Sequence, residues 1–74
     1  MNLLEHMIVK IESTKDVTEE YVNAMRESDP YFTIDEKVFR ISLISECYGI
    51  LEQTKVIWRE SEFIHNLEKG YFMA

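Results

Sequence analysis

Residues 38–44, VFRISLI, decide the fold of this chain, because the same seven residues fit two different patterns. From Phe39 to Leu43 they alternate between apolar and polar and are rich in strand formers, which is typical of a β-strand. Over the longer range 34–48, apolar residues fall almost all round a helical wheel, as in a buried helix. This stretch alone is therefore compatible with a strand and with a helix, and the neighbouring segments must distinguish between the two.

The neighbouring segments favour helices. Residues 3–12 and 17–28 each carry apolar side chains at helical spacing on one face and polar side chains on the other. Pro30 follows the second segment. A proline disfavours the helical backbone conformation in the residue before it, here Asp29, so this helix should end near residue 28. Residues 50–69 gather apolar side chains on one broad side and are followed by Gly70, a residue preferred just past a helix end.

We therefore predict an all-α fold, a small bundle of three to four helices. The helices are expected at about 3–12, 17–28, 34–48 and 50–69. The last two are either continuous or separated at Gly49. The alternative is an α+β fold in which Gly49 turns a hairpin between two strands, near 37–45 and 50–58.

Length and composition indicate one small globular domain spanning residues 1–74. An apolar share of 46% is enough for a core, although the core of so short a chain is thin. The lone Cys47 excludes an internal disulfide and fits a reducing compartment, so we expect a cytoplasmic protein. We expect the apolar tail, residues 71–74, to fold back against the core, with docking on a second subunit as the alternative. The small core leaves a homodimer or higher homo-oligomer open.

The charge is unevenly distributed along the chain. Residues 12–36 hold eight acids and two bases, so this third of the sequence carries the whole net charge of −6. Phosphate contacts require clusters of Lys and Arg, and the sequence contains none. The composition therefore argues against direct binding to nucleic acid and in favour of a partner protein with a basic surface.

Residues that could carry chemistry are scattered. His6, Cys47 and His65 lie far apart in the sequence and lack the spacing of metal ligands. Adjacent acids such as Glu19 and Glu20 diverge by about 100° on a helix and cannot share a substrate. No glycine-rich phosphate loop is present. We predict that the protein is not an enzyme and uses no metal or cofactor.

The most acidic stretch suggests where a partner binds. Residues 26–36, RESDPYFTIDE, place acids around two adjacent aromatics. Thr33 and Glu36 have the spacing of a capping box at the start of the helix expected at 34–48, but this box does not explain the other acids or the two aromatics. The predicted partner-binding residues are Glu19, Glu20, Glu27, Asp29, Tyr31 and Phe32. From these residues we predict a small acidic interaction module that regulates or inhibits a protein with a basic surface. The most specific version of this hypothesis is that the acidic surface imitates nucleic acid.

A second hypothesis rests on the surplus of aromatic residues. It is a small oligomeric ligand-binding protein with an aromatic pocket between subunits. The pocket would use Trp58, Tyr48 and the C-terminal aromatics Tyr71 and Phe72.

Overall fold

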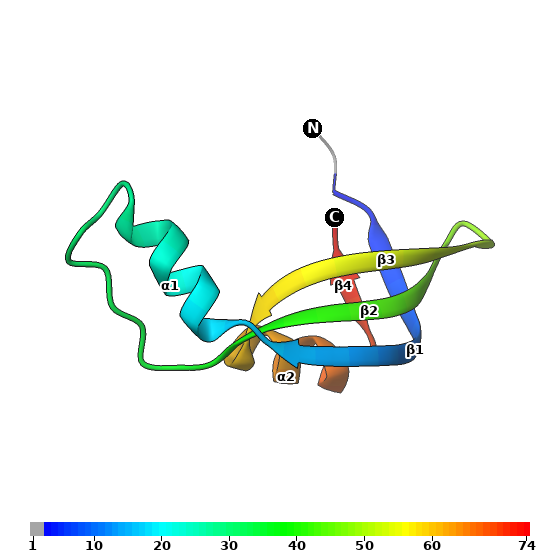
Figure 1. Cartoon of the computed structure of the whole chain (residues 1–74). Helices are drawn as coiled ribbons and strands as arrows, with labels where there is room; N and C mark the ends of the chain where they lie inside the picture. Colours follow the sequence, from blue (N-terminus) through cyan, green and yellow to red (C-terminus); the bar gives the residue numbers. More distant parts are fainter. Residues whose placement is uncertain (1–2) are drawn as a thin grey trace.

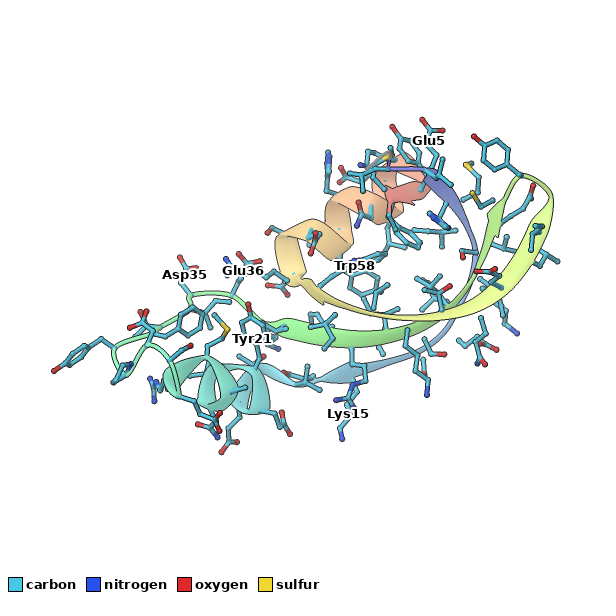
Figure 2. All side chains as sticks on the ribbon, turned by 90° about the horizontal axis from the view of Figure 1, so that it is seen from above. Glu5, Lys15, Tyr21, Asp35, Glu36 and Trp58 are labelled. Atoms are coloured by element: carbon cyan, nitrogen blue, oxygen red, sulfur yellow. The ribbon has the colours of Figure 1, made fainter. Side chains whose placement is uncertain are left out.

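The computed structural model describes residues 3–74, which form a curled four-stranded antiparallel sheet with a short helix on each face (Figure 1). The strands are arranged in the order β3-β2-β1-β4. Helix α2 lies inside the curl, and helix α1 lies outside it at one end of the sheet (Figure 2). The elements are β1 (Glu5–Asp16), α1 (Thr18–Arg26), β2 (Val38–Cys47), β3 (Ile50–Arg59), α2 (Glu60–Lys69) and β4 (Tyr71–Met73).

The predicted all-α bundle is wrong. The helices expected at 3–12 and 34–48 are replaced by strands β1 and β2, and the segment 50–69 divides into strand β3 and helix α2. The helix expected at 17–28 is present as α1. The strands of the alternative fold, near 37–45 and 50–58, correspond to β2 and β3, but β1 was not foreseen in either fold.

Two bulges explain why β1 resembles a helix in sequence. The pairing of β1 with β2 shifts by one residue after Ile8 and again after Ile11. Each shift inserts an unpaired residue, Val9 or Glu12, into β1. Ile8 and Ile11 therefore both face the interior, three residues apart, as they would on one side of a helix. The bulges convert the period of 2 into an apparent period near 3.

The core lies between the inner face of the sheet and α2. Ile41 and Leu43 of β2 are fully buried at its centre, together with Trp58 of β3 and Phe72 of β4. Phe63 of α2 packs against this cluster. The period-2 alternation of β2 places every second side chain in this core, which is why the strand prevails over the helix in residues 38–44.

The turn between β2 and β3 has two residues, Tyr48 and Gly49. Both adopt positive φ, 52° and 79°. Two positive φ values match the type I′ turn, whose twist suits an antiparallel hairpin. Gly49 adopts this conformation at no steric cost, whereas Tyr48 is the one non-glycine residue with positive φ in the part of the chain that the structure describes.

A carboxylate ties the chain before β2 to the start of α2. Glu36 Oε1 accepts hydrogen bonds from the backbone N and the Oγ of Ser61, at 2.9 and 2.8 Å. The predicted capping box of Glu36 with Thr33 is absent, because Glu36 serves the first turn of a helix 24 residues further on. These hydrogen bonds from Ser61 lower the pKa of Glu36.

Removing one methylene group from the core tests its packing. We expect Ile41→Val to lower the free energy of unfolding by about 0.5–1.5 kcal/mol, because Ile41 is fully buried. Urea denaturation measures this change. Ile64→Val is the matched control, since Ile64 is 51% exposed on α2 and should change stability by less than about 0.5 kcal/mol. If both substitutions lowered the free energy of unfolding equally, Ile41 would not lie at the centre of the core.

The bond between Glu36 and Ser61 predicts a pH dependence. The folded-state pKa of Glu36 is lowered, so its stabilisation is present at neutral pH and is lost as the pH falls through that pKa. Glu36→Gln should therefore lower the melting temperature near pH 7, and the difference from the natural protein should shrink towards about pH 3. Asp35→Asn is the control, because Asp35 is an exposed neighbour. A difference that does not change with pH would contradict the role of the carboxylate.

Candidate protein-binding surface

The predicted partner-binding residues all lie on one projecting part of the molecule. We call residues 18–36, which comprise α1 and the connector that follows it, the acidic arm. The arm extends away from one end of the sheet (Figures 1 and 2), and α1 buries none of its residues. The radius of gyration, 13.8 Å, exceeds the roughly 11 Å expected for a compact chain of this length. The negative charge is therefore held away from the core.

The structure accounts for several acids of the arm. Glu19 and Glu20 lie exposed in the first turn of α1, where negative charge complements the helix dipole. Asp29 Oδ1 accepts a hydrogen bond of 3.3 Å from the backbone N of Tyr31 and so holds the turn after α1. Glu27 lies at the C-terminal end of α1, where a carboxylate is mildly unfavourable.

The two aromatics of the arm have different environments. Phe32 packs edge-on against Tyr21 with ring centroids 6.0 Å apart, and its carbonyl accepts a 3.0 Å hydrogen bond from Arg26 Nε. Phe32 therefore folds the connector back onto α1. Tyr31 is 92% exposed. Of the six predicted residues, Glu27 and Tyr31 are the two that the local structure does not require.

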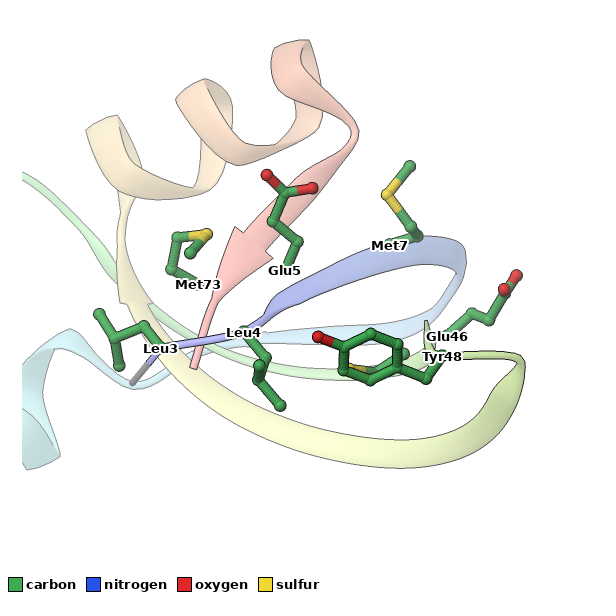
Figure 3. Close-up of a pocket in the computed structure, with 8 residues that line it drawn as sticks. Leu3, Leu4, Glu5, Met7, Glu46, Tyr48 and Met73 are labelled. Carbon is green, nitrogen blue, oxygen red and sulfur yellow. The ribbon is translucent and has the colours of Figure 1, made fainter. Parts of the chain in front are cut away.

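A second surface lies at the opposite end of the sheet, beside the β2–β3 turn (Figure 3). Here the chain forms an open groove of about 390 Å³, which we call the end groove. Its lining comes from the start of β1, from the β2–β3 turn and from β4. The lining residues are Leu3, Leu4, Glu5, Met7, Glu46, Cys47, Tyr48 and Met73.

The end groove exists because two paired strands diverge. The pairing of β1 with β2 ends at Met7 and Glu46. Beyond this pair, the start of β1 continues along β4, while β2 turns into the hairpin with β3. Leu4 exchanges two backbone hydrogen bonds with Ala74, at 2.9 and 3.0 Å, which hold this end of the chain in place. The gap between the diverging strands is the groove.

The end groove exposes apolar side chains and is bordered by carboxylates. Tyr48 is 85% exposed and Leu3 60% exposed, and Leu4, Met7 and Met73 are also exposed. Leu4 and Tyr48 lie on one side of β1, and Glu5 and Met7 lie on the other (Figure 3). The carboxylates of Glu5 and Glu46 are exposed at the same place. An apolar surface of this kind, rimmed by charge, is typical of an interaction site.

Tyr48 combines exposure with an unfavourable backbone conformation. A left-handed conformation costs a residue with a Cβ about 1–2 kcal/mol, and Asn, Asp or Gly is preferred at this position of a type I′ turn. The fold does not bury Tyr48 in return. Neither burial nor backbone preference therefore accounts for a tyrosine at this position.

The structure separates the aromatics that the ligand-binding hypothesis combines. Trp58 and Phe72 are buried in the core, with ring centroids 5.1 Å apart, while Tyr48 projects from the hairpin turn. His6 stacks on Phe72 at 5.2 Å. The apolar tail folds back as β4, because Phe72 fills the core.

Within residues 3–74, no group of three or more His, Cys, Asp or Glu side chains is placed to hold a metal ion. Over the same range, no helix has both the length and the apolar character needed to span a membrane. Comparison with known proteins found no matching family model, no similar curated sequence and no similar solved structure.

Sequence reasoning missed the end groove entirely. The sequence predicts Leu3, Leu4 and Met7 on the apolar face of a helix at 3–12, and it predicts Met73 in an apolar tail that folds back or docks on a second subunit. The one available signal was the pair Tyr48-Gly49, because an aromatic residue at the first position of a two-residue hairpin turn is unusual. That signal becomes visible only once the flanking segments are known to be strands.

Replacing Tyr48 tests whether the fold needs this side chain. Tyr48→Asn should raise the free energy of unfolding by about 0.5–1 kcal/mol, since Asn adopts the left-handed region more readily. Thermal and urea denaturation measure the change. Tyr71→Asn is the control, because Tyr71 is half-buried and pairs with Met7 in the sheet, and its replacement should destabilise. A destabilised Tyr48→Asn variant would show that Tyr48 has a structural role.

Proposed function

We propose that the protein is a small interaction module that binds a basic, partly apolar surface of another protein and regulates or inhibits that protein by covering it. The observation that carries this proposal is Tyr48, an aromatic side chain held exposed in an unfavourable backbone conformation at the edge of an apolar groove. Tyrosine is among the residues that contribute most to protein–protein binding.

The lining of the end groove defines the chemistry of the partner. Leu4 and Tyr48, which lie on the same side of β1, would receive an apolar side chain, and their exposure means that binding removes apolar surface from water. The carboxylates of Glu5 and Glu46 would pair with Lys or Arg beside that side chain. A segment with adjacent apolar and basic residues matches both features.

The acidic arm has a different role in this proposal. It lies at the other end of the sheet, so it contributes long-range attraction while the end groove supplies the close contacts. Charge distributed in this way speeds the encounter with a basic partner and makes the rate depend on salt. Tyr31, exposed on the arm, offers a second contact to a partner large enough to reach it.

Affinity capture from cell extract tests the end groove. The natural protein should retain basic proteins at low salt, and Tyr48→Asn should lose them, with binding weakened by roughly tenfold or more, as for an interface hot spot. Quantitative mass spectrometry measures the retained set. Ile64→Asn is the matched control, because it changes an exposed apolar residue of α2. Retention of the same proteins by the Tyr48 variant would refute the proposal.

Charge reversal tests the acidic arm. Glu19→Lys with Glu27→Lys should slow association with a captured partner by about tenfold at low salt and flatten its salt dependence. Stopped-flow or surface-based kinetics measures both effects. Glu62→Lys with Glu68→Lys makes the same change in net charge on exposed positions of α2. If both pairs act equally, only the total charge matters and the arm has no special role.

A further inference from the structure

Strand β3 forms an open edge of the sheet. It pairs with β2 along its whole length, from Ile50 to Arg59, and is the last strand on its side. Its other side presents backbone N–H and C=O groups that no strand within residues 3–74 pairs with. Such an edge is a ready template for a further strand, and natural proteins usually protect it.

The opposite edge of the sheet is interrupted, whereas β3 is continuous. Beside β1, the strand β4 covers Glu5–Met7, and two bulges interrupt β1 beyond that point. Bulges twist an edge away from pairing. The ten residues of β3 contain no register shift and no proline. Exposed apolar side chains, Leu51 at 63% and Ile57 at 54%, also lie along it.

The hairpin determines which residues of β3 can pair outward. Cys47 and Ile50 flank the two-residue turn, so they form a hydrogen-bonded pair, and the even-numbered residues of β3 bond to β2. The odd-numbered residues therefore direct their N–H and C=O groups towards the open edge. These residues are Leu51, Gln53, Lys55, Ile57 and Arg59.

We propose that β3 pairs with β3 of a second copy of this chain, antiparallel, about a two-fold axis at Thr54. An axis perpendicular to the sheet places residues of the same face opposite each other. With the axis at Thr54, Leu51 of each copy lies opposite Ile57 of the other, so two exposed apolar residues cover each other twice. Gln53 lies opposite Lys55 in the same register.

The neighbouring register is disfavoured by charge. An axis at Lys55 would place the two Lys55 side chains directly opposite each other, and like charges opposite one another destabilise a sheet. Strand β3 holds Glu52, Lys55 and Arg59, a net charge of +1 on a chain whose net charge is −6. This edge therefore escapes most of the repulsion that the acidic arms would impose on two copies.

A cavity beside Ile57 supports the same register. Between α1 and the outer face of the sheet lies an open cavity of about 220 Å³, lined by Val17, Glu20, Tyr21, Ala24, Arg40 and Ile57. The Leu51 of the second copy, opposite Ile57 on this face, lies next to the cavity and can cover its apolar lining. A single pair of strands makes a small interface, so the dissociation constant should be on the order of micromolar.

Cysteine cross-linking tests the register. In a Cys47→Ser background, Thr54→Cys should form a disulfide between two copies under copper–phenanthroline oxidation at about 100 μM protein, because the axis brings these positions within disulfide distance. Lys55→Cys is the control and should cross-link at least about tenfold more slowly, since its two copies are offset along the strands. Faster cross-linking of Lys55→Cys would overturn the register.

Sedimentation velocity over a concentration series tests the dimer itself. Leu51→Lys should raise the dissociation constant by at least about tenfold, because it replaces an apolar contact with a charge in both halves of the interface. Ile64→Lys, exposed on α2, makes the same change away from β3 and should leave the constant unchanged. If the natural chain stays monomeric up to about 1 mM, the proposal is wrong. The open edge of β3 would then be a site for an extended segment of another protein.

Discussion

The structure depends on the pairing of β2 with strands on both of its sides. Ile41 and Leu43 reach the interior only because β2 is extended. Strands β1 and β3 align on β2 and add Ile8, Ile11 and Trp58 to the same core, which Phe63 and Phe72 complete. Each strand alone would expose its apolar side chains, and a helix over the same residues would scatter them around its axis. The core of this short chain is thus assembled from contacts between residues far apart in sequence.

The two ends of the sheet differ in what they expose. At one end the chain leaves the sheet as the acidic arm, which carries charge and one exposed aromatic, Tyr31. At the other end β1 and β2 diverge around the end groove, and Tyr48 projects from the turn beside it. The core uses neither end. In the proposed function, the acidic end supplies long-range attraction and the end groove supplies close apolar contact.

The sequence misled most strongly where local geometry breaks a simple period. In β1 the two bulges place Ile8 and Ile11 on the same face, so a strand carries the apolar spacing of a helix. Glu36 looked like the end of a local capping box, yet it binds Ser61 at the start of α2. Phe32 looked like a free anchor, yet it packs on Tyr21. In each case the deciding partner is another segment of the chain.

Some features follow from the sequence alone, because their causes are local. They are the confinement of the net charge to residues 12–36, the helix before Pro30 and the helix end at Gly70. The tertiary structure decided the strands, the end groove and the open edge of β3. These features depend on which strand pairs with which and in what register, and the alternation within one strand does not specify its partner.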